Sequence, residues 1–594
     1  MLRYYRAQSK IYKLVYLNHL IERSLNESSI ERNQKKQERH MKERTRAQES
    51  TGAIERLYIS MRHLFSRGFY KPMGVSGETL RKSLLQLRPE IYGSIAEEKV
   101  ELNGLIYIIE RLPEGIEECK FINLTADEGY KESHFKAIIP AKRRRNCYRV
   151  DKDQMNIEIT RGRSEIYDIL THLTFLFIES HKIKDKVLID DGENCIREWN
   201  TLKEIVLYDK NITKEEREVT IAHLGTILGR TYKEVSSVYT TFSTEKNPDR
   251  FFQLIYWLGQ LAINESNENK KRVITFSSVL NEQIGQHIYG EIWAVNIKKT
   301  LKENNLLERP IHIISANMHS VMNSIYAKGA LPDEYKTHEG FKLFGLLSNQ
   351  NSEAIQVKVK NYASKNGLIY IKDTSGTNIN VQLIDTEKID MKSTTYSKVN
   401  SKGTKPVLIV MDYAFGEQAY ETMDELLKPY KTETETTHLN VESVSIMGKA
   451  GILEGGKGDI MIPSSHVFEG TADNYPFKNE LSKEDLEGFG VKSFDGAMIS
   501  VLGTSLQNKD LLKFFHDSTW NVIGLEMEGA HYQKAIQAAS KIRGNISENV
   551  KVRYAYYASD NPMETGATLA SGGLGMSGVT PTYAITQRIL EQIL

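Results

Sequence analysis

The sequence predicts an α/β protein whose N-terminal half is mostly helical and whose C-terminal half is built around a sheet. Up to about residue 305 the apolar residues recur at helical spacing, as in ITKEEREVTIAHLGTILG and RFFQLIYWLGQLA. After Pro310 short β-rich runs alternate with glycine turns and helical stretches, for example IHIISA, IQVKVK, LIYIKD, PVLIVM, DIMIP and VRYAYYASD. We therefore expect a basic, helix-rich region (1–150), a helical domain (151–305) and an α/β domain (306–594).

The composition is that of a folded protein and argues against two kinds of partner. Apolar residues make up 40% and charged residues 26% of the 594 positions, which excludes a disordered or fibrous chain. With 78 basic and 77 acidic side chains the formal charge is +1, so a nucleic-acid partner or a membrane surface is not expected. No run of 18 apolar residues and no secretory signal is present. Three isolated cysteines, Cys119, Cys147 and Cys195, fit reduced thiols and a cytoplasmic location.

Three polar features of the first half allow more than one interpretation. Residues 26–50 offer little apolar surface and predict a solvated helix or a flexible arm. The basic run 142–145 (KRRR) is more often a solvated loop than a nucleic-acid or phosphate site. Between residues 164 and 183 one helical stripe carries Glu165, Asp168, His172 and Glu179, and we read it as a polar helix face because no Glu-x-x-His pair accompanies it. We expect no metal and no cofactor.

Polar or glycine-rich segments follow five of the apolar runs, where a ligand site is expected. In open α/β sheets ligands bind outside the carboxyl ends of the strands. The segments that come directly after IHII, VLIVM, VSIM, VIGL and RYAYY are 315–320 (SANMHS), 412–417 (DYAFGE), 448–451 (GKAG), 526–528 (EME) and 558–560 (ASD). Each is weak alone, because a glycine there is usually a turn and a carboxylate usually caps a helix.

Taken together and in this order, these segments resemble the nucleoside phosphorylase and nucleosidase superfamily, which includes purine nucleoside phosphorylases, methylthioadenosine nucleosidases and AMP nucleosidases. The resemblance is most specific in GKAGILEGGKGDIMIP, read as a glycine-rich turn leading into the next strand, in GLEMEGAHYQKA and in YYASDN. It covers the chain from near Arg309 to the C-terminus. It implies a phosphorylase-like three-layer α/β domain with a central mixed sheet, and an enzyme that cleaves the N-glycosidic bond of a purine nucleotide or nucleoside.

The resemblance also implies roles for individual residues. Asp560 would give a proton or a strong hydrogen bond to N7 of the departing base. Glu528 would accept hydrogen bonds from the 2′- and 3′-hydroxyls, with Met527 and Glu526 completing the ribose site. The expected phosphate-binding residues are Ser315, His319, Gly416, Gly448 and Lys449. The expected base-binding residues are Ser505, Leu506 and Ser559, with Leu506 standing where an aromatic residue is common.

Departures from the superfamily pattern decide the order of the candidate reactions. Lys449 replaces the phosphate-binding serine of the phosphorylases and still favours an anion. Residues 317–320 (NMHS) contain no carboxylate where methylthioadenosine nucleosidases carry their water-activating glutamate. Residues 559–566 (SDNPMETG) are closest to a segment of AMP nucleosidases, which also carry a non-catalytic N-terminal domain. Hydrolysis of a purine nucleotide is therefore our first expectation.

Two alternatives stay open, and the resemblance also bears on partners. One alternative is phosphorolysis by a purine nucleoside phosphorylase, and the other is a catalytically inactive protein that senses nucleotides. The expected partners are a purine nucleotide or nucleoside and, in the phosphorolytic case, inorganic phosphate. Because this superfamily usually builds its sites at subunit contacts, we also expect a homo-oligomer.

Overall fold

The computed structural model describes residues 45–143, 145–189, 194–208, 212–267, 271–338, 341–349, 352–396, 405–471, 473–564 and 574–594. The polar segment predicted over residues 26–50 therefore lies almost wholly outside the described residues. Residues Ser50–Leu594 form one compact unit, separate from Met1–Glu49. The boundaries expected at 150 and 305 stay predictions. None of the described helices is long and apolar enough to cross a membrane.

The first half combines helices with a small mixed sheet that the sequence did not predict. Its helices are α2 (Arg46–Arg67), α3 (Val75–Leu87), α4 (Leu102–Ile109), α5 (Gly162–Val187), α6 (Arg197–Leu207), α7 (Lys214–Leu228), α8 (Tyr232–Phe242), α9 (Arg250–Asn267), α10 (Ser278–Gly285) and α11 (Ile288–Glu303). Its strands are β1 (Phe69–Tyr70), β2 (Phe121–Thr125), β3 (Ala137–Ile138), β4 (Cys147–Asp151), β5 (Gln154–Glu158) and β6 (Val273–Phe276), paired in the order β1-β6-β2-β5-β4-β3. Since β2 pairs with both β5 and β6, this sheet joins residues on either side of position 150.

Helix α5 runs through the apolar core of the first half. It is 26 residues long, and most of its side chains are buried, including Ile166, Leu173 and Phe177. A helix that is apolar on nearly every side must be surrounded by other elements. It packs most extensively against α9 and also contacts α3 and α7.

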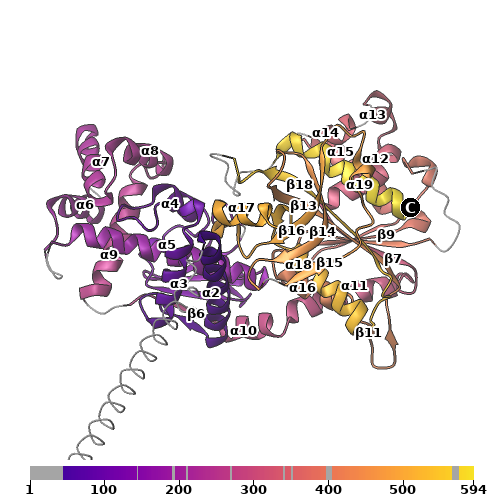
Figure 1. The fold of residues 1–594 in the computed structure, drawn as a ribbon, viewed down its shortest axis with the longest axis horizontal. Coiled ribbons are helices and arrows are strands. Elements are labelled where there is room, and N and C mark those ends of the chain that lie inside the picture. The colour runs from indigo at the N-terminus through magenta and orange to yellow at the C-terminus, as the bar shows by residue number, and fades with distance from the viewer. Residues whose placement is uncertain are drawn as a thin grey trace, which may run out of the picture. The chain divides into compact units, whose positions relative to one another are not determined.

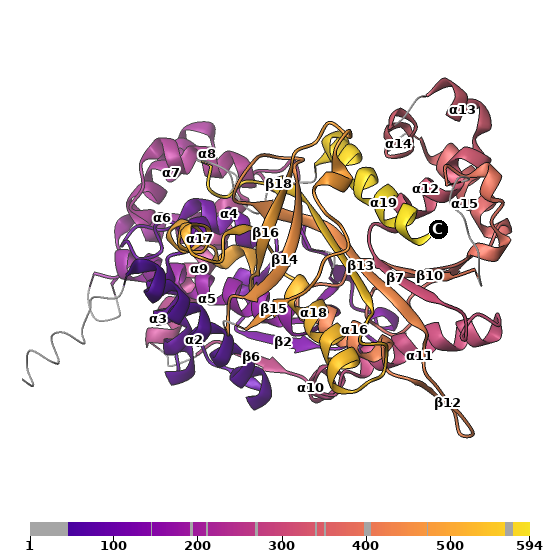
Figure 2. The same ribbon diagram turned by 45° about the vertical axis from the view of Figure 1, so that its right-hand side comes forward.

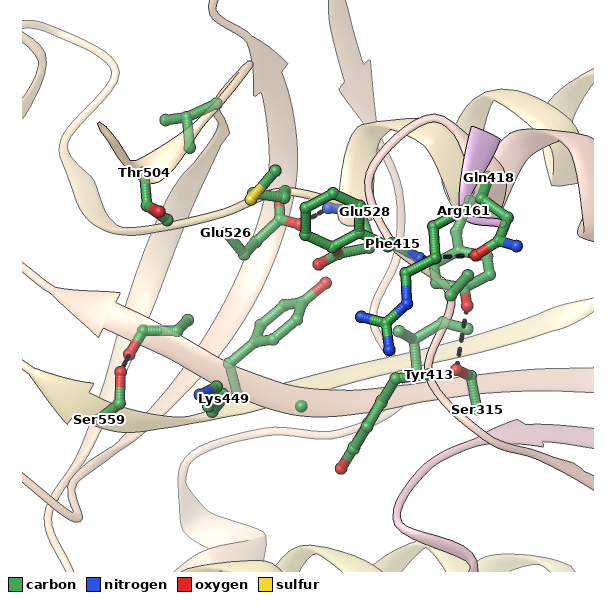
Figure 3. A pocket seen from close by; sticks show the side chains of 18 of the residues that line it. Arg161, Ser315, Tyr413, Phe415, Gln418, Lys449, Thr504, Glu526, Glu528 and Ser559 are labelled. Atoms are coloured by element: carbon green, nitrogen blue, oxygen red, sulfur yellow. Dashed lines mark hydrogen bonds between the residues drawn. The ribbon is translucent and has the colours of Figure 1, made fainter. Parts of the chain in front are cut away.

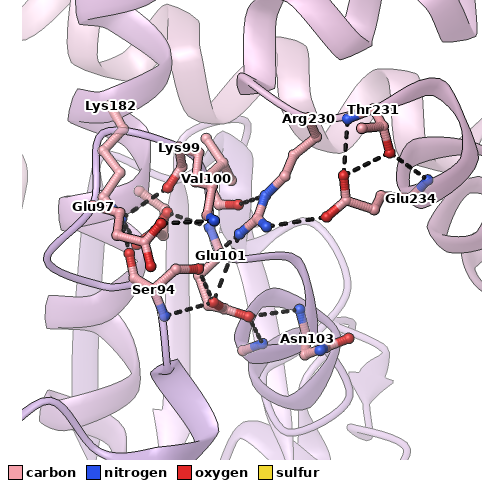
Figure 4. Close-up of polar contacts among 12 residues, drawn as sticks. Ser94, Glu97, Lys99, Val100, Glu101, Asn103, Lys182, Arg230, Thr231 and Glu234 are labelled. Atoms are coloured by element: carbon pink, nitrogen blue, oxygen red, sulfur yellow. Dashed lines mark hydrogen bonds and ion pairs between the residues drawn. The ribbon is translucent and has the colours of Figure 1, made fainter.

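A buried polar network ties the connecting segments of the first half to α5 (Figure 4). The Glu101 carboxylate accepts a hydrogen bond from Ser94 N–H at 2.8 Å and lies 3.7 Å from the Arg230 guanidinium. Arg230 also donates to the carbonyl oxygen of Val100 at 2.7 Å. From α5, Lys182 donates to the carbonyl oxygen of Ser94 at 3.2 Å. These contacts satisfy charged groups that would otherwise be costly to bury.

The second half contains the mixed sheet that the sequence predicts. The strands β7 (Ile311–Ser315), β8 (Leu368–Ile371), β9 (Val381–Asp385), β10 (Val407–Met411), β13 (Val441–Ile452), β14 (Ile460–Phe468), β15 (Asn474–Pro476), β16 (Ser493–Ser500), β17 (Val522–Glu526) and β18 (Lys551–Asp560) belong to it. Their order is β15-β14-β16-β17-β13-β7-β10-β9-β8, and β18 pairs with β13 and β14. A separate hairpin, β11 (Tyr430–Lys431) with β12 (Thr436–Thr437), lies outside it.

Apolar side chains on the two faces of this sheet belong to two different clusters. In β10, Val407 and Ile409 join one cluster, whereas Leu408 and Val410 join the other. The first cluster also contains residues of α11, α16 (Gln418–Leu426) and α18 (Gly529–Gln537). The second contains residues of α12 (Met318–Ala330), α14 (Lys342–Leu347), α15 (Glu353–Lys365) and α19 (Val579–Ile593). Figure 2 shows these two sets of helices on either side of the strands. Helices α13 (Pro332–Thr337) and α17 (Lys509–Asp517) complete the half.

Two details of the predicted strand pattern are wrong. The run IQVKVK lies in helix α15, where Val359 and Ala363 are buried one turn apart and Lys358 and Lys360 are exposed. Its alternation of apolar residues and lysines resembles a strand only over a short window. Residues 448–451 lie inside the long strand β13 and not in a turn after it. The glycine turn comes later, at residues 454–458.

The core of the first half continues into the second half. The apolar cluster built around α5 also contains Val501, Leu506 and Leu525 together with residues of α17. Asn508 donates to the carbonyl oxygen of Leu87 at 2.8 Å, and Glu90 N–H donates to the carbonyl oxygen of Gln507 at 2.8 Å. Figure 1 shows the first half packed on the side of the sheet where β16 and α17 lie. The first half therefore covers one end of the strands that carry the predicted site.

We expect Gly524→Ala in β17 to destabilise the protein by about 1–3 kcal/mol or more, the usual cost of overpacking a core. A Cβ at this position would lie 2.3 Å from the Met461 sulfur and 2.6 Å from the carbonyl oxygen of Gly451. Denaturant unfolding checks this. Gly285→Ala at the end of α10 is the matched control, because its Cβ meets nothing within 4 Å. Equal stability of the two variants would contradict this packing.

Candidate active site

A cavity of about 510 Å³ lies where the carboxyl ends of the central strands meet the first half. Ser315 from β7, residues 412–415 after β10 and residues 446–451 of β13 line it, together with residues 525–528 and Ser559 from the ends of β17 and β18. Tyr107, Arg111, Arg143 and Arg161 of the first half line it as well. Figure 3 shows side chains from both halves around the same space.

Glu526 organises the turn between β17 and α18. Its carboxylate accepts hydrogen bonds from the Ser500 hydroxyl and from the backbone N–H groups of Glu528 and Gly529, and His466 Nδ1 lies 3.4 Å away. Burial alone disfavours its charge, but the hydrogen bonds from His466, Ser500 and Gly529 outweigh burial and lower its pKa. Both of its oxygens are engaged within the protein. Glu526 also lines the cavity, and its predicted ribose-binding role stays a prediction.

Glu528 faces the cavity and is ready to accept or donate a hydrogen bond. Gly416 N–H donates to its carboxyl at 2.9 Å. Burial raises the pKa of Glu528 to about 8, and the nearby Glu526 charge adds to this shift, while the Gly416 hydrogen bond and Lys449 oppose it. Two neighbouring carboxyls thus differ in ionisation at neutral pH. Met527 lines the cavity beside Glu528, and the ribose-binding role of both residues stays a prediction.

Asp560 ends strand β18 next to Ser559, and Asp560 is not itself a lining residue of the cavity. It is buried, and the Ser559 hydroxyl donates to its carboxylate at 2.5 Å. Ser559 also donates to the carbonyl oxygen of Ala450 at 3.1 Å and lines the cavity. Asn561 donates to the carbonyl oxygen of Gly455, which anchors the glycine turn to this strand end. The predicted catalytic carboxyl thus has a fixed neighbour at the cavity wall.

The predicted phosphate-binding residues divide between two cavities. Ser315, Gly448 and Lys449 line the first, where the Ser315 hydroxyl lies 3.1 Å from the Tyr532 hydroxyl. His319, on α12, lines a second cavity of about 580 Å³, and Lys449 lines both. Gly416 contributes its N–H to Glu528 and is not a lining residue.

Two of the three predicted base-binding residues do not reach the cavity. Ser505 and Leu506 are each 2% exposed, and Leu506 joins the core of the first half. The adjacent residues Val501 and Thr504 line the cavity in their place. Residues Thr504–Leu506 form a short helical turn, so consecutive side chains point in different directions. The prediction treated this segment as the end of a strand and could not foresee which side chains face the cavity.

The sequence did not predict that arginines of the first half line the cavity, and only the basic run 142–145 gave an indication of it. Arg143 belongs to the basic run 142–145, for which a phosphate site was the alternative to a solvated loop. Its neighbour Arg145 points inward and lies 3.2 Å from Glu165, while Arg143 lies 3.4 Å from Asp168. Arg111 and Arg161 stand in segments without any local pattern, so only the fold brings them to the cavity.

The acidic stripe of α5 is used in ion pairs. Glu165 and Asp168 bind arginines of the basic run, and Glu179 lies 2.9 Å from Lys182. His172 is fully buried and lies 3.6 Å from Asp168. Burial lowers the pKa of His172 to about 4, so it is neutral at physiological pH. Within the described ranges no group of three or more His, Cys, Asp or Glu side chains is arranged to hold a metal ion.

The chain belongs to the family described as "Family of unknown function (DUF6909)", whose model matches residues 78–331 and 342–594. No curated protein matches it.

Solved nucleosidase structures are similar to about half of the chain at low identity. The 5′-methylthioadenosine/S-adenosyl homocysteine nucleosidase of Campylobacter jejuni is 12% identical over 48% of this chain and 99% of its own, with a TM-score of 0.29. The futalosine hydrolase of Helicobacter pylori strain 26695 gives the same values. The 5′-methylthioadenosine nucleosidase of Arabidopsis thaliana is 11% identical over 48% of this chain and 96% of its own, with a TM-score of 0.28.

We expect Glu528→Gln to raise the free energy of unfolding by roughly 1–3 kcal/mol at pH 8 and to change it little near pH 4.5. The unfolded chain ionises this group near its ordinary pKa of 4.5, whereas the folded protein keeps it protonated up to about pH 8. The folded state therefore binds more protons, and wild-type stability falls as pH rises through this window.

Denaturant unfolding of wild type and Glu528→Gln at several pH values measures this difference. Glu218→Gln, at an exposed position of α7, is the control and should behave like wild type at every pH. A stability difference between wild type and Glu528→Gln that does not change with pH would contradict the raised pKa.

Proposed function

We propose that this protein cleaves the N-glycosidic bond of a purine nucleotide or nucleoside by hydrolysis and releases the free base. The observation that carries the proposal is the convergence of Ser559 beside Asp560, of Met527 with Glu528 and of Lys449 on one cavity. These residues come from three different strands, and each was predicted for this chemistry from its position at a strand end or its resemblance to the superfamily.

The residue types suit the reaction. When the bond between C1′ and the base breaks, the base takes up electrons and the ribose becomes cationic. Asp560 would donate a proton to N7 of the base, and water would supply the hydroxyl to C1′ and return a proton to the carboxylate. Glu528 would hold the ribose hydroxyls and place negative charge near the cationic sugar when ionised. Ser559 would keep the Asp560 carboxyl oriented.

Phosphorolysis is the second candidate, and Lys449 favours it. This lysine lines both the first cavity and the second, where Asn317 and His319 stand. A cation that lines both cavities can hold inorganic phosphate on one side of the ribose while the base lies on the other. An inactive nucleotide sensor is the third candidate, because residues 317–320 carry no carboxylate to activate water. The cytoplasmic location and the homo-oligomer stay predictions.

The deciding experiment is incubation with a panel of purine nucleosides and nucleotides, with and without inorganic phosphate. Chromatography would detect free base and either ribose or ribose 1-phosphate. Release of free base together with a sugar that carries no phosphate at C1′ supports hydrolysis. A requirement for inorganic phosphate, with ribose 1-phosphate as product, supports phosphorolysis. No base release from any compound, together with tight nucleotide binding, would favour the sensor.

We expect Asp560→Asn to fold normally but to slow base release by about 10²–10⁴-fold, the usual contribution of a positioned acid. The amide keeps the size of the side chain but cannot transfer the proton. Steady-state rates with the best substrate of the panel measure the effect. Ser559→Ala should cause a smaller loss, because it removes only the orienting hydroxyl. Near-normal turnover by Asp560→Asn would remove this residue from the mechanism.

We expect Glu528→Ala to impair ribosides more than 2′-deoxyribosides, by roughly tenfold in the ratio of their kcat/KM values. A riboside loses the hydrogen bonds of its 2′- and 3′-hydroxyls to Glu528, whereas a 2′-deoxyriboside loses only the hydrogen bond of its 3′-hydroxyl. Parallel kinetics with adenosine and 2′-deoxyadenosine, or with the matching nucleotides, provide the measurement. Equal losses for both sugars would show that Glu528 does not bind the ribose.

A further inference from the structure

We propose that Arg111, Arg143 and Arg161, all contributed by the first half, bind a phosphate group carried by the substrate. This inference rests on the proposed function and narrows its substrate class to purine nucleotides. The structure thereby gives the first half a binding role at the site. Two independent groups of observations support it, one at Arg161 and one at Arg111 with Arg143.

Arg161 extends into the cavity as an uncompensated cation. It precedes α5 and lies next to the loop after β10, where Gln418 donates to the carbonyl oxygen of Thr160 at 3.4 Å. Among the described residues, its guanidinium has no hydrogen-bond or ion-pair partner, although it lines the cavity. Figure 3 shows it on the same side of the cavity as Phe415 and Gln418, across Lys449 from Ser559.

Arg111 supplies a buried donor that needs an acceptor. It is 6% exposed, its guanidinium stacks 3.4 Å from the centre of the Tyr107 ring, and one amino group donates to the carbonyl oxygen of Tyr107 at 2.8 Å. Its Nε is buried without a hydrogen-bond partner in the part of the chain that the structure describes. The Glu110 carboxylate is 3.8 Å away. A buried donor left unpaired is costly, and a phosphate oxygen would pair it.

Arg143 places a second positive charge close to Arg111. Burial lowers the pKa of Arg111, and the Arg143 charge lowers it further. Arg143 lies 3.4 Å from Asp168, and Arg145, which also approaches Asp168, lies 3.2 Å from Glu165, so these two arginines are balanced by two carboxylates. Two arginines that repel each other at a cavity wall are stabilised when an anion binds between or beside them.

The balance of charge in the cavity favours an anion. Four cations line it, the three arginines and Lys449, together with three carboxyl groups, Asp412, Glu526 and Glu528. Glu526 is already paired with internal donors, and Glu528 is largely protonated at neutral pH because its pKa is about 8. Arg143 is paired with Asp168, so Arg111, Arg161 and Lys449 against the carboxylates of Asp412 and Glu526 leave one net positive charge. This charge matches the anionic phosphate of a nucleotide better than an uncharged nucleoside.

The positions of these groups define how a nucleotide would lie. With its base beside Ser559 and its ribose at Glu528, the substituent on the far side of the ribose points toward Arg161. The Gly416 N–H that binds Glu528 lies two residues before Gln418, the first residue of α16, which binds Thr160 next to Arg161, so Glu528 and Arg161 lie near the same segment. The cavity of about 510 Å³ is within the usual range for small-molecule sites.

The test compares binding of AMP and adenosine, and of GMP and guanosine, to the full chain by calorimetry, with base release measured in parallel. The variants are Arg161→Gln, Arg161→Lys and Arg111→Gln. Lys142→Gln is the matched control, because it removes an exposed cation of the same basic run outside the cavity lining. We expect wild type to prefer the nucleotide at least about tenfold.

We expect Arg161→Gln and Arg111→Gln to weaken nucleotide binding by about ten- to a hundredfold and nucleoside binding far less. Arg161→Lys should restore part of the loss, and Lys142→Gln should match wild type. Equal loss for nucleotide and nucleoside would show that the arginines act structurally and would overturn the proposal. The proposal would also be overturned if these variants changed only the concentration of inorganic phosphate that base release requires.

The two proposals fail in different ways. If wild type releases base but binds AMP and adenosine equally, the phosphate subsite is refuted and the proposed reaction stands. If AMP binding depends on the arginines but no compound of the panel loses its base, the proposed reaction is refuted and the phosphate subsite stands.

Discussion

The site depends on the contact between the start of α5 and the loop after β10. Glu417 N–H donates to the Ser164 hydroxyl at 2.8 Å, and Glu417 pairs with Arg163 at 3.0 Å. One residue earlier, Gly416 N–H binds Glu528 at 2.9 Å. Gly416 has a positive φ of 54°, and a Cβ there would lie 2.2 Å from the Ser164 hydroxyl oxygen, so only glycine permits this approach. A single loop therefore attaches the first half and positions the Glu528 carboxyl.

This arrangement makes the first half a wall of the cavity and creates its unusual electrostatics. Because the wall excludes solvent, Glu528 stays protonated up to about pH 8, while Glu526 next to it remains ionised through its internal donors. The same wall brings arginines to the cavity that the sheet alone does not supply. The positive charge of these arginines is costly to bury, and a substrate of opposite charge would offset that cost.

The sequence predicts the part of the site that local patterns encode. Strand β10 is a continuous apolar run, and β7 and β18 are mostly apolar or aromatic. Their carboxyl ends point to Ser315, Asp412 and Asp560. The short strands β1 and β3 have two residues each, too few for any periodicity to be seen. The segment 448–451 resembles a turn because glycine and alanine give no strand signal, although pairing with β18 keeps it extended. Thr160 and Gln418 are 258 positions apart in the chain, and their hydrogen bond leaves no trace in the local sequence.

Arg161 and Lys449 stand at different parts of the cavity, so they can serve two different tasks in the proposed reaction. A hydrolase that acts on a nucleotide must bind the substrate's phosphate and also control what attacks C1′. Arg161 stands on the side of the loop after β10, whereas Lys449 stands between the first cavity and the second, which contains Asn317 and His319. When the arginines hold the phosphate of the substrate, Lys449 remains available for the attacking group. Under the proposed function, Lys449 would then influence the choice between water and inorganic phosphate independently of how the nucleotide is recognised.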